Sequence, residues 1–170
     1  GLLGCRSILA HSIHLSDSEL SVIKNKDCAL AHCPSSNFFL KSGVFPYARV
    51  KAEAIKFGLG SDVAAGPQMS MFQVMKDANY IQPLDWLDAR ELLYRSTLGA
   101  ARALGLQEQT GSLQIGKDAD FIVVDPGLRT GIAADILSQL TDEILSSMVF
   151  LGDDRIIVAT YLRGKSLYKI

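Results

Sequence analysis

The stretch Ser7-Ile8-Leu9-Ala10-His11 is a short apolar run that stops on a side chain able to do chemistry. The same arrangement recurs twice, because residues 29–31 lead into His32 and residues 58–61 lead into Asp62. In a barrel of alternating parallel strands and helices, the active site is built from residues at the carboxyl ends of the strands. The pattern therefore predicts buried strands of a parallel sheet, with a functional site formed by the residues that follow them.

Segments of helical pattern separate these runs. Ser16 and Glu19 have the spacing of a capping box, which predicts a helix from there to about Lys26. Residues 34–37 read Pro-Ser-Ser-Asn, a composition typical of a turn, and we expect them to end the second strand.

The same alternation continues further along the chain. The spacing of apolar residues predicts a helix near 47–57, closed by Gly58 as its C-terminal cap, and a third strand over 59–62. Two more helices are predicted, one near 68–80 and one over about 85–104 that stops at Gly105 and has a candidate break at Gly99. Strands separated by helices at this spacing indicate an α/β fold with a parallel sheet.

The last third of the chain has a different character. Residues 120–125 form a β-type run, residues 135–148 have a helical pattern, and strands are predicted over 156–162 and 166–170. Gly164-Lys165 is the candidate two-residue hairpin turn between the last two strands. This tail is typical of a small β subdomain packed on the α/β portion.

Composition excludes several classes of function. The chain has 170 residues, 48% of them hydrophobic, and its formal net charge is -1, which does not favour nucleic acid or an acidic membrane surface as partner. No apolar stretch approaches the roughly 18 residues of a membrane span, and no signal peptide is recognised. The 3 cysteines favour reduced thiols, and hence a cytoplasmic protein.

Asp62 is the strongest candidate for a functional residue. A carboxylate at the end of a short, glycine-flanked, buried strand is costly unless it binds a cation or accepts hydrogen bonds. It can therefore be a metal ligand, or it can be the N-cap of the structure that follows. Both interpretations stay open on the residue pattern alone.

The histidines also admit several roles. His11 can be a general base, a metal ligand or a buried histidine with satisfied hydrogen bonds, and His32 is a weaker candidate for the same roles. His14 is expected in a loop or on the surface. The turn over residues 34–37 can be simply structural, with Asn37 bonding to local backbone, and the role of Asn37 stays open.

Three motifs together resemble a known pattern. They resemble the sixth, seventh and eighth strands of the amidohydrolase superfamily, in its branch of nucleobase deaminases and chlorohydrolases. The motifs are Leu9-Ala10-His11-Ser12-Ile13-His14-Leu15, Ala31-His32-Cys33-Pro34-Ser35-Ser36-Asn37 and Gly58-Leu59-Gly60-Ser61-Asp62-Val63. Residues 111–120 resemble the junction between barrel and β-sandwich in that superfamily, and residues 150–155 are similar to the guanine deaminase family within the branch.

The resemblance implies a specific architecture. Residues 1–108 would form the C-terminal portion of an amidohydrolase TIM barrel, about three of its βα units, and residues 109–170 part of a small β-sandwich subdomain with a helix. Such a barrel typically takes about 250 residues. We therefore expect this chain to be the C-terminal part of something longer.

The resemblance also implies a reaction, the zinc-dependent hydrolysis of guanine to xanthine and ammonia in purine catabolism. Asp62 matches the eighth-strand aspartate, which ligates zinc and helps to take the proton of the attacking water. His11 matches the sixth-strand histidine, which orients that water and helps to deprotonate it. His32 lies near the mouth of the site in this reading, without an assigned role. The remaining zinc ligands would lie upstream of this chain, so the isolated chain would be inactive.

Two other readings remain alongside this one. The first is a related amidohydrolase, a deaminase or chlorohydrolase, that acts on another heterocycle. The second is a non-catalytic truncated product. The implied partners are a small-molecule purine substrate and, for the complete protein, a second copy in a homodimer, with no nucleic acid and no membrane.

Overall fold

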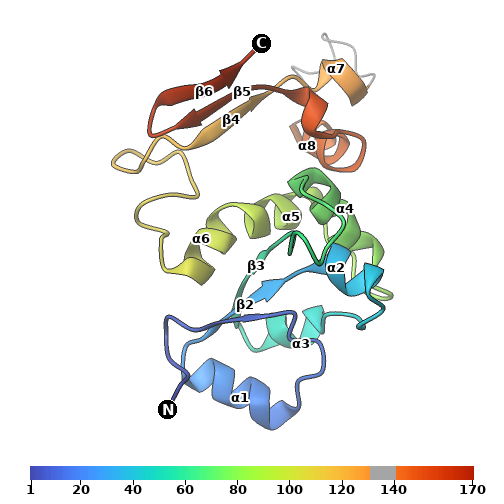
Figure 1. The fold of residues 1–170 in the computed structure, drawn as a ribbon, viewed down its shortest axis with the longest axis vertical. Helices are drawn as coiled ribbons and strands as arrows, with labels where there is room; N and C mark the ends of the chain where they lie inside the picture. The colour runs from blue at the N-terminus through green and yellow to red at the C-terminus, as the bar shows by residue number, and fades with distance from the viewer. Residues whose placement is uncertain (131–140) are drawn as a thin grey trace.

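A parallel sheet forms the first half of the molecule. The computed structural model describes residues 1–130 and 141–170. Strands β1 (Ile8–Ala10), β2 (Ala29–His32) and β3 (Lys56–Leu59) lie in the order β1-β2-β3, and both neighbouring pairs are parallel. The predicted α/β arrangement is confirmed, and because both pairs are parallel, the carboxyl ends of all three strands lie at one edge of the sheet. Strands β2 and β3 of this sheet are labelled in Figure 1.

The first connecting helix is set by the capping box that the sequence predicts. Helix α1 (Asp17–Asn25) begins after Ser16. The backbone N–H of Ser16 donates to the Glu19 carboxylate at 2.8 Å, and the N–H of Glu19 donates to Ser16 Oγ at 3.3 Å. The two bonds satisfy N–H groups that the first turn of a helix leaves unpaired.

The segment predicted as a turn after β2 is a helix instead. Residues 34–37 open α2 (Pro34–Phe39), with Pro34 at its first position. Proline suits that position because its fixed φ is helical and its missing N–H has no partner in the first turn anyway. Proline, serine and asparagine favour both turns and helix starts, so the composition alone pointed to the wrong one.

The third strand begins earlier than predicted. Helix α3 (Tyr47–Ala52) is short, Ala54 adopts a left-handed φ of 54°, and β3 follows at Lys56. Phe57, predicted on a helix face, pairs with Leu30 in the β2–β3 ladder and is fully buried. The apolar spacing of 50, 54 and 57 imitates a helix, but Ala54 interrupts it.

Gly58 is a strand residue and not the predicted helix cap. A Cβ at this position would lie 2.7 Å from Cα of Ala100, which belongs to helix α6 (Leu98–Leu104). Glycine therefore allows α6 to lie directly against β3 (Figure 1).

Three helices lie between β3 and β4, where the sequence predicted two with a candidate break in the second. Helix α4 (Met71–Tyr80) is confirmed, and the helix predicted over 85–104 is divided into α5 (Ala89–Ser96) and α6. The division lies at Thr97, whose φ of -125° and ψ of -102° are not helical. The predicted stop at Gly105 is confirmed, with this residue in the left-handed conformation.

The C-terminal sheet is antiparallel. Strands β4 (Phe121–Val124), β5 (Ile157–Leu162) and β6 (Lys165–Lys169) lie in the order β4-β5-β6. The hairpin turn between β5 and β6 consists of Arg163 and Gly164, one residue earlier than predicted, and both have the positive φ that such turns require.

Short helices connect this sheet to the rest of the molecule. They are α7 (Gly127–Thr130), α8 (Thr141–Phe150) and the 3₁₀ turn η1 (Asp154–Ile156). The helix predicted over 135–148 is observed from Thr141 onward, and residues 135–140 lie outside the described residues. Helix α8 lies against α4 and α5 (Figure 1).

One hydrophobic core runs through both halves. Its buried side chains come from β2 and β3, from the helices packed around them, and from α8 and η1, and include Leu20, Ile23, Leu30, Val50, Phe57, Val74, Leu92, Val149 and Ile156. None of the helices that the structure describes has the length and apolar character needed to cross a bilayer.

Candidate functional site

His11 and Asp62 face each other at the carboxyl edge of the parallel sheet. His11 directly follows β1, and Asp62 comes three residues after the end of β3. Nε2 of His11 lies 3.7 Å from Oδ2 of Asp62, and the two side chains are 41% and 30% exposed. The structure thus brings together the two residues that the sequence singled out, in a place that a small molecule can reach.

Both residues have an unusual backbone conformation. The φ angles are 63° at His11 and 53° at Asp62, in the left-handed region that residues other than glycine seldom adopt. Such conformations cost of the order of 1–3 kcal/mol and gather at functional sites. The chain therefore turns sharply at both strand ends and directs the two side chains toward each other.

Asn37 contributes to this site from helix α2. Its Oδ1 lies 2.8 Å from Nδ1 of His11, and the side chain is 1% exposed. The sequence left the role of Asn37 open, with bonding to local backbone as one interpretation, and the structure shows instead a side-chain contact with a residue 26 positions away. The sequence carries no signal for this contact, because it depends on where the fold places α2 relative to His11.

His32 is buried and does not line the mouth of the site. Its ring is 0% exposed and stacks on Phe45, with ring centres 4.3 Å apart. Burial, and secondly the proximity of His11, lowers the pKa of His32 to about 3. His32 is therefore a neutral ring at neutral pH.

Several buried polar atoms around His11 have no hydrogen-bond partner within the part of the chain that the structure describes. They are both ring nitrogens of His32, Oγ of Ser36 and Nδ2 of Asn37. Leaving such an atom unpaired costs about 1–3 kcal/mol, so folded proteins contain few of them. Their concentration beside the His11–Asp62 pair is typical of a place that binds a ligand or ordered water.

Among the described residues, Asp62 is the candidate metal ligand that the sequence singled out. A carboxylate such as that of Asp62 is a normal zinc ligand, but a catalytic site needs about three protein ligands. Across residues 1–130 and 141–170, no group of three or more His, Cys, Asp or Glu side chains is placed to hold a metal ion. Cys33 lies nearby, but burial and the charge of Asp62 raise the pKa of its thiol, which disfavours the thiolate that zinc binds.

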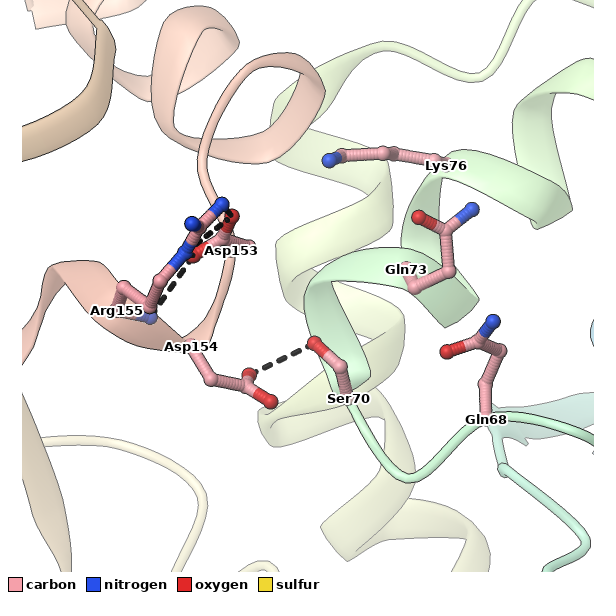
Figure 2. Close-up of a pocket in the computed structure, with 7 residues that line it drawn as sticks. All are labelled: Gln68, Ser70, Gln73, Lys76, Asp153, Asp154 and Arg155. Carbon is pink, nitrogen blue, oxygen red and sulfur yellow. Dashed lines mark hydrogen bonds and ion pairs between the residues drawn. The ribbon is translucent and has the colours of Figure 1, made fainter.

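A separate hollow lies between the start of α4 and the segment 153–155 (Figure 2). It has a volume of about 280 Å³ and is lined by Gln68, Ser70, Gln73, Lys76, Asp153, Asp154 and Arg155. The Ser70 hydroxyl donates to Oδ1 of Asp154 at 2.7 Å, and Lys76 donates to the carbonyl of Gly152 at 2.7 Å.

These bonds make the hollow a joint between two parts of the chain. Ser70 is the N-cap of α4 and Lys76 lies in the middle of that helix, whereas Gly152 lies between α8 and η1 and Asp154 is the first residue of η1. Arg155 is paired with Asp153. The joint holds the segment 150–155 against α4, and it contains neither His11 nor Asp62.

Comparison with known proteins identifies the family. The amidohydrolase family pattern matches residues 1–167. Guanine deaminase of Escherichia coli strain K12 is 35% identical over 173 residues, an alignment that covers 99% of this chain and 39% of the relative.

Solved structures give the same result for the fold. An E. coli guanine deaminase structure superposes with a TM-score of 0.89 at 33% identity, over 99% of this chain and 40% of that one. An adenosine deaminase of Xanthomonas campestris with bound zinc superposes with a TM-score of 0.84 at 27% identity, over 99% of this chain and 38% of that one. The chain thus spans about two fifths of the length of these proteins. With a family match along nearly its whole length, the chain belongs to the amidohydrolase family.

Proposed function

We propose that the protein carrying this chain is a zinc-dependent guanine deaminase, which hydrolyses guanine to xanthine and ammonia. The observation that carries the proposal is the His11–Asp62 pair, 3.7 Å apart at the carboxyl edge of the parallel sheet. The choice of guanine as substrate is supported by guanine deaminases from several organisms, which are 30–35% identical to this chain. In this proposal β1, β2 and β3 belong to a TIM barrel over residues 1–108, and residues 109–170 are part of a β-sandwich subdomain.

Asp62 would hold the zinc ion through its carboxylate. Zinc, when bound, supplies a water molecule whose pKa is lowered toward ~7. The contact between Nε2 and Oδ2 is longer than a hydrogen bond, so both groups keep the capacity to bind a third atom placed between them and the substrate. In this proposal one carboxylate oxygen of Asp62 binds the zinc ion, and the other oxygen orients the water molecule and can accept its proton.

His11 would take and return the proton. Imidazole titrates near neutral pH, which suits a group that accepts a proton from water and later donates to the leaving amine. The bond that breaks joins the ring carbon of guanine to its amino nitrogen, and a carbonyl forms in its place. The neutral state of His32 supports this role, because a second imidazolium beside His11 would oppose its protonation.

The rest of the site would come from elsewhere. The relatives extend well beyond the part that aligns with this chain, and we expect the other zinc ligands and the residues that select guanine to come from that part of the fold. The isolated chain would then lack activity. A cytoplasmic location, a role in purine catabolism and a homodimer stay predictions from the resemblance.

An assay on the full-length protein encoded by the gene tests the proposal. Zinc-loaded protein should convert guanine to xanthine and release one ammonia per xanthine, and it should leave adenine and a chlorinated triazine unchanged. Turnover of one of those heterocycles without turnover of guanine would favour the related-amidohydrolase reading. Absence of all three activities at one zinc per protein would favour the non-catalytic reading.

A further inference from the structure

We propose that Asn37 is a positioning residue that holds His11 in one tautomer, with the proton on Nδ1 and the lone pair of Nε2 directed toward Asp62. The inference rests on the proposed function, in which Nε2 of His11 accepts a proton. It assigns a role to Asn37, a residue that has no part in the reaction described above.

The contact is short and shielded from water. Oδ1 of Asn37 lies 2.8 Å from Nδ1 of His11, and the Asn37 side chain is 1% exposed. A neutral imidazole carries one N–H donor and one acceptor nitrogen. If Nδ1–H donates to the amide oxygen, Nε2 must be the acceptor.

No other bond fixes the ring among the residues that the structure describes. The contact of Nε2 with Asp62, at 3.7 Å, is too long for a hydrogen bond. The backbone of His11 is held separately, because its N–H donates to the carbonyl of Ala31 at 2.9 Å. Rotation of the imidazole ring about the Cβ–Cγ bond of His11 would therefore break the contact with Asn37 and leave the backbone hydrogen bond to Ala31 intact.

Asn37 itself is held rigidly. Its N–H donates to the carbonyl of Cys33 at 3.0 Å, and its carbonyl accepts from the N–H of Ser42 at 2.9 Å. Helix α2 is tied to α4 because the Ser35 hydroxyl donates to Asp77 Oδ2 at 2.6 Å. A residue fixed at both backbone groups and buried on its side chain can impose an orientation on its neighbour.

Two substitutions separate this role from a purely structural one. In Asn37→Asp the carboxylate can only accept, so it should preserve the Nδ1–H tautomer. In Asn37→Leu the side chain keeps a similar volume but has no acceptor, so both tautomers should be populated. Asn79→Leu is the matched control, because Asn79 is also a buried asparagine but bonds to the carbonyl of Leu87 instead.

The primary readout is the ¹⁵N spectrum of histidine-labelled, zinc-loaded, full-length protein, with the His11 signals assigned by their loss in His11→Ala. In the unsubstituted protein, in Asn37→Asp and in Asn79→Leu, neutral His11 should show a protonated Nδ1 and an unprotonated Nε2. Asn37→Leu should lose this signature, and its kcat for guanine should fall about 10²-fold with little change in KM, since a correctly placed general base is worth at least that much.

Several results would overturn the inference. One is a neutral His11 protonated on Nε2 in the unsubstituted protein, and another is an unchanged tautomer in Asn37→Leu. If Asn37→Leu does not fold, the spectra of the unsubstituted protein and of Asn37→Asp decide by themselves. The tautomer is measured without substrate, so absence of guanine turnover would count against the proposed function and not against the role of Asn37.

Discussion

The two sheets of this molecule differ in almost every respect that matters for function. Strands β2 and β3 are nearly all buried, and the polar side chains that follow β1 and β3 meet at one edge. Every residue of β6 is exposed, and β4 is at most half-buried. The comparison indicates that the parallel sheet positions the side chains of His11 and Asp62, while the antiparallel sheet is attached to it through α8 and the polar joint of Figure 2.

Substitution of Asp62, in the first region, should reduce zinc binding or turnover more than any other change, and substitution of Asp154, in the second region, is its control. In the full-length protein, Asp62→Asn should lose zinc or nearly all guanine turnover, because an amide is a poor replacement for a carboxylate ligand. Asp154→Asn, at the polar joint, should keep both zinc and turnover. Metal analysis and an assay of the two variants side by side check this.

Either variant can break the comparison. Normal zinc content and normal turnover in Asp62→Asn would remove Asp62 from the site. Loss of zinc in Asp154→Asn, with the fold intact, would extend the site into the antiparallel half.

Within the first region, substitution of His11 should lower kcat much more than substitution of His14. His11→Ala should keep its zinc but lose about 10²–10⁴-fold in kcat, the usual contribution of a general base. His14→Ala should change little, because His14 is exposed and its Nε2 contacts the carbonyl of Ser42. Loss of zinc from His11→Ala, measured by metal analysis, would show instead that His11 is a ligand.

Stability should follow the same division. Leu30 in β2 is 0% exposed, and Leu167 in β6 is 64% exposed. Leu30→Ala should lower the free energy of unfolding by about 2–5 kcal/mol, because it removes buried methyl groups and leaves a cavity. Leu167→Ala should change it by less than about 0.5 kcal/mol. Urea unfolding measures both, and equal losses would mean that β6 is covered in solution.

The sequence located the strands of the second region more accurately than those of the first. Strands β4, β5 and β6 begin and end within about one residue of their predicted bounds. In the first region the run before His11 located the end of β1 and the capping box at Ser16 located α1, but β3 ends at Leu59 and not at Asp62. The contact between Asn37 and His11 was not readable, because it joins residues 26 positions apart through the packing of α2. The helical spacing of Val50, Ala54 and Phe57 predicts a helix that includes Phe57. The structure shows instead that Phe57 pairs with Leu30 and belongs to β3, and such a pairing cannot be read from the sequence.

The smallest expected effect concerns His32, the buried ring of the first region. Its pKa is about 3 in the folded protein and 6.5 as the reference value, so the unfolded chain binds the proton more tightly. The stability contributed by neutral His32 is complete above pH 6.5 and falls as pH drops from there toward 3. Between pH 7 and 5.5 this amounts to about 1 kcal/mol.

Comparison with a variant isolates this contribution. His32→Phe keeps a ring that can stack on Phe45 but removes the titration. The difference in unfolding free energy between the two proteins, measured by urea at both pH values, should therefore change by about 1 kcal/mol. An unchanged difference would mean that His32 is solvated or paired in solution.

The central claim is that the carboxyl edge of the parallel sheet holds the metal. Anomalous scattering at the zinc absorption edge, from crystals of the zinc-loaded full-length protein, tests it most directly. We expect a zinc peak within bonding distance, about 2.0–2.2 Å, of a carboxylate oxygen of Asp62, with the His11 ring beside it. A zinc peak elsewhere, with Asp62 and His11 free of metal, would contradict it.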